Sequence, residues 1–184
     1  MNKRCDWVPI DNELSVKYHD EEWGKPIHND RKLFEMLILE GAQAGLSWLT
    51  VLKKRDNYRI ALDSFNYKKI ARYDEKKIKE LLENQGIIRN KLKINSIVQN
   101  AKAFLKIQKE FGSFNRYIWS YVNNKTIQNK FKTWKEIPTK TELSDKISKD
   151  LKKRGMNFVG PTIIYSFLQA VGIVNDHTIE CFRK

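Results

Sequence analysis

Apolar residues recur at spacings of three and four through most of the chain, and no run alternates apolar and polar residues as a half-buried strand does. Spacings of three and four collect side chains on one face of a helix. The pattern predicts seven or eight helices of ordinary length and a polar, irregular connection around residues 123–140. We therefore expect a compact all-α fold in which residues 1–184 form a single domain. The expected helix starts and stops are N-caps at Ser47, Asp74 and Ser113 and stops at Gly86, Gly112, Gly155 and Gly172.

The charge balance indicates a polyanionic partner. The chain has 35 Lys and Arg against 22 Asp and Glu, a net charge of +13. Lysines are spread along the chain and five tryptophans accompany them, which favours nucleic acid over a membrane surface, although part of the excess can be plain solvated surface. The N-terminus has no apolar signal segment, no run of eighteen apolar residues is present, and there are only two cysteines. We expect a soluble protein of a reducing, cytoplasmic compartment with no membrane partner.

One acidic residue interrupts an apolar helix face. Residues 31–41 are expected to form a helix with Asp30 as N-cap and Arg31 facing Glu35. Glu40 projects from the apolar stripe of that helix, whereas Glu35 falls on its wetter face. A carboxylate at such a position must be desolvated or partnered, and both cost free energy. Two interpretations stay open: a functional buried acid, or an acid at a helix end that reaches water or a buried cation.

A second feature is the junction between two C-terminal helices. A lysine-rich helix stops at Gly155, and Pro161 opens the next helix as its first residue. Gly160 permits close backbone approach, and the free amide groups of the new helix form an anion site flanked by Lys152, Lys153 and Arg154. The junction fits either a turn that holds a phosphate backbone or an ordinary helical corner.

Four possible metal ligands lie near the two ends of the chain: Cys5, His19, His177 and Cys181. The last two are separated by three residues, which places both on one face of a helical turn. Two thiolates and two imidazoles suit a tetrahedral, structural Zn²⁺ that would join the two termini. The alternative is two buried thiols and two surface histidines that never meet. The His19-Asp20-Glu21 segment matches the H-x-E of zinc deaminases, but their Cys-x-x-Cys pair is absent and we reject that function.

An ordered set of segments resembles the DNA-3-methyladenine glycosylase I family over nearly the whole length. These segments are Cys5-Asp6-Trp7, Tyr18-His19-Asp20, Glu22-Trp23-Gly24, LFEMLILEGAQAGLSWLTVLKKR, GIIRNKLKI, KKRGMNFVGPTIIYSF and NDH followed by Cys181. The resemblance implies a helix-hairpin-helix DNA glycosylase, with that element at about residues 143–172. It also implies one structural zinc per chain, held by Cys5, His19, His177 and Cys181.

The resemblance assigns a base pocket and a DNA-binding surface. Glu40 matches the pocket carboxylate, Tyr18 and Trp48 match its aromatic walls, and Trp7 and Trp23 match aromatics beside it. Leu46 matches the residue that wedges into the space left by an extruded nucleotide, and the hairpin matches a segment that grips the DNA backbone. The expected DNA-binding residues are Gly45, Leu46, Lys153, Arg154, Gly155, Gly160 and Thr162.

The implied activity is monofunctional removal of 3-methyladenine from alkylated double-stranded DNA by a monomer, leaving an abasic site with no lyase step. Methylation at N3 makes adenine cationic, so aromatic faces and one carboxylate suit it, and the cation is already a good leaving group. Ser15 stands where the family often has another tyrosine, which leaves the wall thinner there or covered by Trp7. Asp176 is open between a catalytic role, an N-cap and a hydrogen bond to an imidazole.

Two other classes of function remain compatible with the residues. One is a zinc-stapled protein that binds damaged or branched DNA without releasing a base. The other is a basic helical protein whose partner is RNA or a membrane surface.

Overall fold

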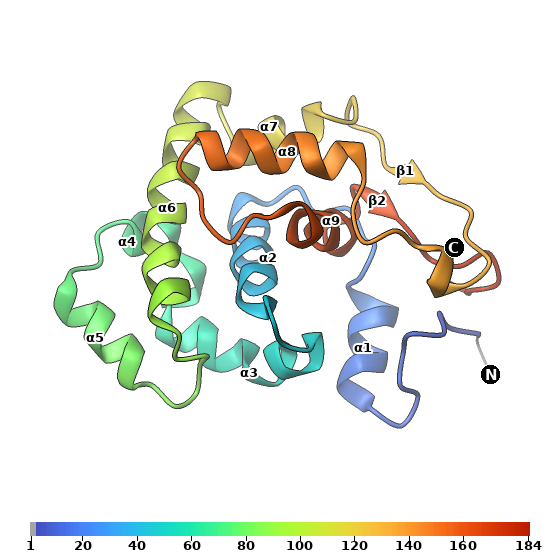
Figure 1. The fold of residues 1–184 in the computed structure, drawn as a ribbon, viewed down its shortest axis with the longest axis horizontal. Helices are drawn as coiled ribbons and strands as arrows, with labels where there is room; N and C mark the ends of the chain where they lie inside the picture. Colours follow the sequence, from blue (N-terminus) through green and yellow to red (C-terminus); the bar gives the residue numbers. More distant parts are fainter. Residues whose placement is uncertain (1–2) are drawn as a thin grey trace.

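Helices α2 (Asp30–Gln43) and α9 (Pro161–Ala170) lie at the centre of the fold in the computed structural model, which describes residues 3–184 (Figure 1). Every residue of α2 from Leu33 to Ala42 is buried, as expected for a helix covered on all sides. Helix α9 packs against α2 and against the helix that precedes it. This central pair is therefore the scaffold on which the site is built.

The remaining helices surround this pair. They are α1 (Glu13–Glu21), α3 (Trp48–Ala61), α4 (Tyr67–Ile70), α5 (Glu75–Glu83), α6 (Lys91–Phe111), α7 (Phe114–Ser120) and α8 (Glu142–Lys153), with short 3-10 turns η1 (Asp63–Phe65) and η2 (Trp134–Glu136). The predicted helical fold is confirmed. Nine α-helices lie within residues 3–184, slightly more than the spacing indicated, because a four-residue helix such as α4 is too short to show a period.

A pair of two-residue strands lies outside the helical prediction. Strand β1 (Ile127–Gln128) pairs in parallel with β2 (Val174–Asn175). Two residues cannot display an alternating pattern, so the sequence carried no signal for them. The pairing ties the irregular connection before α8 to the segment that follows α9.

The helix caps show where local chemistry was sufficient. Ser47, Asp74 and Ser113 are N-caps as predicted. The N-cap of α2, however, is Asn29 and not Asp30. The Asp30 carboxylate instead accepts the backbone N–H groups of Phe114 (2.9 Å) and Asn115 (2.8 Å). It thus satisfies the free amides at the start of α7, which stabilises the contact between two helices distant in sequence.

Glu35 also differs from its expected environment. Its side chain is buried and accepts hydrogen bonds from the Arg59 guanidinium of α3 at 2.6 and 2.8 Å, while Arg31 forms no ion pair among residues 3–184. The expected pairing of Arg31 with Glu35 is wrong. A partner from another helix covers this face, and periodicity within α2 cannot reveal it.

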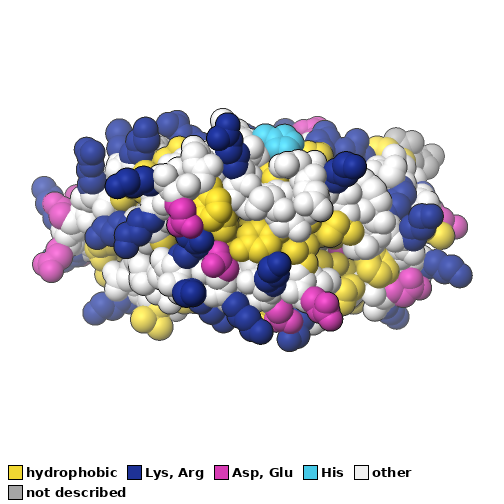
Figure 2. Space-filling view, turned by 90° about the horizontal axis from the view of Figure 1, so that it is seen from above, with side chains coloured by type: hydrophobic (Ala, Val, Ile, Leu, Met, Phe, Trp, Pro, Cys, Tyr) yellow, Lys and Arg dark blue, Asp and Glu magenta, His cyan; other side chains and the backbone are white. Residues whose placement is uncertain are grey.

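The segment that begins at Lys3 and the C-terminal segment lie on the same side of the molecule, near α1 (Figure 1). The Phe182 N–H donates to the Lys3 carbonyl at 2.9 Å, so the end segments are in direct contact. Lys and Arg side chains are scattered over the face in Figure 2, interspersed with acidic and hydrophobic groups. Although the chain has a net charge of +13, the basic side chains on that face do not gather into a single patch. In the described part of the chain, no helix combines the length and the apolarity that crossing a bilayer requires.

Candidate active site

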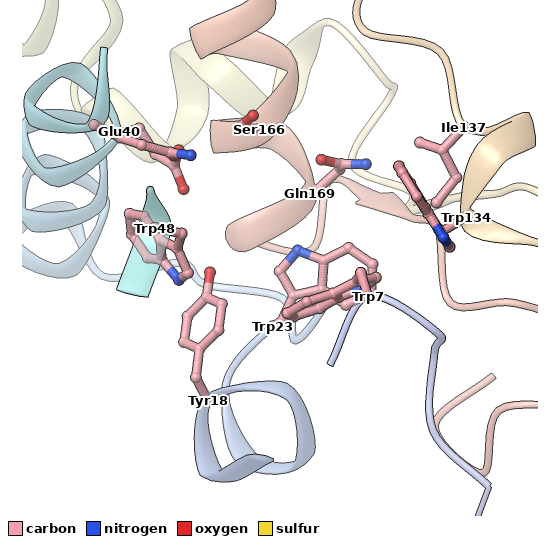
Figure 3. A pocket seen from close by; sticks show the side chains of 10 residues that line it. Trp7, Tyr18, Trp23, Glu40, Trp48, Trp134, Ile137, Ser166 and Gln169 are labelled. Carbon is pink, nitrogen blue, oxygen red and sulfur yellow. The ribbon is translucent and has the colours of Figure 1, made fainter. Parts of the chain in front are cut away.

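A cavity of about 240 Å³ opens between α1, α2, α3 and α9, with Glu40 at one end and Trp134 at the other (Figure 3). Four of the five tryptophans line it, so aromatic surface is concentrated here. The lining residues are Trp7, Tyr18, Trp23, Glu40, Gln43, Trp48, Trp134, Ile137, Ser166 and Gln169. The structure therefore brings all five predicted base-pocket residues to one cavity.

Glu40 is buried at 3% exposure and its Oε2 has no hydrogen-bond partner. Burial without a compensating charge raises the pKa of this carboxyl from 4.5 to about 8. The Nε1–H of Trp48 is likewise buried and unpartnered. Unpaired buried polar groups cost about 1–3 kcal/mol each. Two of them beside one cavity are available for hydrogen bonds to a ligand with polar edges.

The aromatic walls are built from several elements. The Tyr18 and Trp48 rings lie with centroids 5.2 Å apart, and Trp7 meets Trp23 edge-on at 5.1 Å. Burial, followed by the nearby Glu40 charge, raises the pKa of Tyr18 well above its usual value, so its hydroxyl stays protonated. Ser15, one turn before Tyr18, is buried and does not line the cavity, whereas Trp7 does. A cavity lined by electron-rich aromatic rings suits a planar cation.

Several lining residues were missed in the sequence. Ser166 and Gln169 are three apart in the otherwise apolar helix α9, and this spacing was the signal that could have found them. Trp134 and Ile137 come from the irregular connection, where no periodicity exists to place them. Only tertiary structure shows that this connection closes the cavity.

The burial of Glu40 predicts a pH-dependent gain in stability for Glu40→Gln. Unfolding returns the carboxyl to its ordinary pKa of 4.5, so the raised folded value of about 8 makes stability fall as pH rises from 4.5 to 8. Gln does not ionise and avoids this loss. At neutral pH we expect the free energy of unfolding of Glu40→Gln to exceed that of wild type by on the order of 3 kcal/mol. The difference should vanish near pH 4.5. Urea unfolding at several pH values in that window measures it, and a difference independent of pH would contradict the account.

A smaller cavity of about 170 Å³ adjoins the first, sharing Glu40, Gln43 and Ser166 with it. It reaches Leu46, which is 42% exposed, and Thr162 at the start of α9. Gly45 has φ +75°, a conformation that favours glycine and turns the chain between α2 and α3. An exposed leucine therefore stands beside the entrance to the aromatic cavity.

The segment between α8 and α9 presents bare backbone. Gly155 has φ +92°, and a Cβ added at Gly155 or Gly160 would meet nothing within 4 Å. Pro161 opens α9, and no side chain caps the free amides at its start. These features leave the backbone N–H groups accessible to an anion.

Of the three cations expected to flank this segment, Lys152 and Lys153 are exposed and without an ion pair among residues 3–184, whereas Arg154 is paired. The Arg154 guanidinium donates to Glu110 at 2.6 Å and to Asp150 at 2.7 Å. It also lies over the Phe111 ring, 5.1 Å from its centroid. Its charge is already balanced within the protein, so a phosphate contact by Arg154 would compete with these partners.

Three of the four predicted metal ligands come together beside the cavity. The ligand atoms of Cys5, His19 and Cys181 lie within 4.8 Å of one another, and all three residues are buried. The His177 ring is adjacent, 5.1 Å from the His19 ring, and its buried Nε2 has no partner. An orphaned imidazole nitrogen beside two thiols and a second imidazole is a donor set that fits a tetrahedral metal ion.

The outer contacts of this cluster orient both imidazoles. His19 Nδ1 bonds to Asp20 at 2.7 Å and His177 Nδ1 to Asn175 at 2.7 Å, which leaves each Nε2 available as a ligand, and His19 Nε2 lies 3.5 Å from the Cys181 Sγ. Gly24 has φ +75°, and a Cβ there would come within 2.6 Å of the His177 ring. The glycine that follows Trp23 is thus required by the position of this histidine.

Among residues 3–184, Asp176 has neither of the two structural roles left open for it, an N-cap and a hydrogen bond to an imidazole. Its buried carboxylate accepts from Tyr165 at 2.5 Å, Gln169 at 2.7 Å and Asn129 at 2.7 Å. Within the described chain it neither caps a helix nor bonds to a histidine ring. These bonds connect α9 to the segments that follow the paired strands, which gives Asp176 a structural role.

Comparison with known proteins decides the family. The family model for methyladenine glycosylase matches residues 7–184. The chain belongs to the methyladenine glycosylase family. Members of this family are hydrolases of N-glycosyl bonds. The chain is 48% identical over 181 residues to the DNA-3-methyladenine glycosylase of Haemophilus influenzae, covering 98% of this chain and 97% of that protein.

Solved structures in the family agree with the fold. The crystal structure of a 3-methyladenine DNA glycosylase I matches with a TM-score of 0.95 at 49% identity, covering 98% of both chains. The Staphylococcus aureus enzyme, whose structure addresses 3-methyladenine recognition, matches with a TM-score of 0.92 at 36% identity over 94% of this chain and 92% of that one. The expected family and helical fold are therefore confirmed.

Proposed function

We propose that this protein removes 3-methyladenine from alkylated double-stranded DNA by hydrolysis and leaves an abasic site. The observation that carries the proposal is the unpartnered Glu40 carboxyl, buried at the end of an aromatic cavity. The relatives named above act on or recognise the same base. We also propose that residues 1–184 act as a single monomeric domain, with a helix-hairpin-helix element formed by α8, the 154–160 turn and α9.

Recognition follows from charge. A 3-methylated adenine in DNA is cationic, and its charge lowers the pKa of an adjacent carboxyl, so Glu40 ionises when such a base enters. Neutral adenine provides no such stabilisation and leaves the carboxyl protonated. Contact with the electron-rich surfaces of Tyr18 and Trp48, whose rings lie tilted against each other at the cavity wall, adds an interaction that favours a cationic ring. Discrimination therefore arises from the coupling between one buried acid and the charge of the base.

The chemistry needs modest help because the leaving group is already activated. The bond between the base nitrogen and the sugar carbon breaks, and its electron pair stays with the base, which leaves neutral. Water then bonds to the sugar cation and releases a proton to solvent. Ionised Glu40 stabilises the positive charge shared by base and sugar during this step. In the described chain no lysine lines the cavity, so we propose no imine and no lyase step.

Base extrusion requires contacts outside the cavity. We propose that Gly45 and Leu46 enter the duplex, with Leu46 filling the vacated space, while Lys153, Gly155, Gly160 and Thr162 contact the phosphate backbone. The exposed leucine beside the cavity entrance and the open backbone at both glycines support this arrangement. Extrusion costs a few kcal/mol, which these contacts must offset. For Arg154 we propose a part through its backbone, since its side chain is paired.

We further propose that Cys5, His19, His177 and Cys181 hold one zinc ion. The three converging ligand atoms and the orphaned His177 Nε2 support this assignment. A zinc ion with four protein ligands supplies a structural cross-link. The site joins the N-terminal segment that carries Trp7 to the end of the chain, and thereby holds one wall of the cavity.

The deciding experiment is chromatography of the bases that the purified protein releases from methylated DNA. We expect free 3-methyladenine with the DNA backbone uncut. Binding to the DNA without any released base would favour a non-enzymatic damage-binding protein. Binding to RNA or anionic vesicles as tight as to duplex DNA, again without release, would favour the third class of function.

A further inference from the structure

Lys93 is engaged by the end of the helix that carries Glu40. Its Nζ donates to the carbonyls of Ala42 at 2.8 Å and Ala44 at 2.6 Å. The last carbonyls of a helix have no partner within the helix, and a cation there also interacts favourably with the helix dipole. Lys93 therefore closes the C-terminus of α2 from a different helix, α6.

This contact is specific to Lys93. Its side chain is half-buried, and burial lowers the pKa of its ammonium group. Among residues 3–184 no carboxylate lies within ion-pair distance of it, so the two carbonyls are the polar partners that the structure shows. Lys91, two residues earlier on α6, is exposed and makes no such contact. Partial burial of a lysine without a counter-ion costs free energy, and the hydrogen bonds to the two carbonyls offset that cost.

The segment held by Lys93 leads directly to Leu46. We call residues 44–47 the wedge loop. Ala44 ends α2 and Gly45 turns the chain with φ +75°. The Leu46 N–H then donates to the Gln43 carbonyl at 2.7 Å. The direction in which Leu46 projects therefore depends on how the end of α2 is held.

The same helix also holds the 154–160 turn. Asn100, two turns beyond Lys93, donates to the Asn157 carbonyl at 2.9 Å and accepts the Asn157 N–H at 2.8 Å. Gln99 donates to the Gly155 carbonyl at 2.8 Å. One rigid helix thus contacts both segments that face DNA in the proposed function.

We propose that Lys93 is a positioning residue that fixes the wedge loop relative to the 154–160 turn, so that both engage one deformed duplex. The proposal rests on the proposed function, because it presumes that Leu46 enters DNA. Two segments that bind one bent duplex must keep a set separation. In enzymes a misplacement of about 1 Å can lower the reaction rate up to 100-fold. Lys93 acts through Leu46 and does not touch the base.

The test is a double-mutant cycle measured by binding to a duplex that contains an abasic-site analogue. We expect Lys93→Met to weaken binding about tenfold in the wild-type background and less than about twofold in the Leu46→Ala background. Lys91→Met removes the same charge from the same helix turn and serves as the matched control. We expect this control to weaken binding only through its share of the overall charge, to the same extent in both backgrounds.

The outcomes separate this proposal from the proposed function. Equal effects of Lys93→Met in both backgrounds would mean a general structural role and would overturn the proposal, as would wild-type binding by Lys93→Met. If Lys93→Met does not fold, Lys93→Gln stays polar and cannot span both carbonyls, so the same pattern is expected of it. Absence of base release with an intact binding cycle would refute the excision activity alone.

Discussion

Glu40→Gln is expected to reduce release of 3-methyladenine from methylated DNA by about 100-fold or more, the loss typical of removing one preorganised electrostatic contact. Gln has nearly the same shape and hydrogen-bonds within the cavity, but it cannot ionise. The variant therefore retains the aromatic walls and loses the charge that a cationic base induces on Glu40. Single-turnover release, followed by chromatography of the free base, measures the effect.

Glu35→Gln provides a matched control for this prediction. It makes the same chemical change at another buried glutamate of α2, whose partner is Arg59 and which does not line the cavity. We expect it to lose stability and to keep near wild-type excision per folded molecule. Equal excision by Glu40→Gln and wild type would refute the role assigned to Glu40.

Loss of the proposed zinc is expected to have the largest effect on stability. Structural zinc contributes about 10 kcal/mol or more to the folding of small zinc domains, and a domain with its own core depends on it less. We expect about one zinc per chain by elemental analysis. Cys181→Ser should lower the free energy of unfolding by about 3–5 kcal/mol, or roughly 10 °C in melting temperature.

Excision separates a structural from a catalytic metal in this experiment. Because the cluster lies outside the base end of the cavity, we expect the folded fraction of Cys181→Ser to retain most of its activity. His28→Gln, at an exposed histidine away from the cluster, should leave both metal content and stability unchanged. A metal-free preparation with the melting temperature of the zinc-containing protein would contradict the assignment.

The sequence predicted the local features of this fold better than the contacts between different helices and strands. Ser47, Asp74 and Ser113 were recognisable as N-caps because capping depends on residues within one turn. The place of Glu40 on the apolar helix face was also predictable from spacing, but spacing left open whether its carboxyl is buried and unpartnered or reaches water or a cation. The same spacing argument failed for Glu35, because Arg59 of α3 packs against it and buries it.

The cavity shows the same division. Residues of α1, α2 and α3 were assigned through family resemblance, whereas Trp134 and Ile137 lie in a connection whose path depends on the β1–β2 pairing. The metal cluster is similar: side chains distant in sequence meet only because the two termini lie together. Long-range contacts of this kind leave no periodic signal in a single sequence.

The central claim is that a buried acid becomes charged in response to a cationic base. The most direct test is the pH dependence of the second-order rate constant for 3-methyladenine release, which reports ionisations of the free enzyme. The account predicts that the wild-type constant rises with pH and levels off near pH 8, where Glu40 ionises, and that the Glu40→Gln constant is low and flat. A wild-type profile as flat as that of the variant, at the same rate, would contradict it.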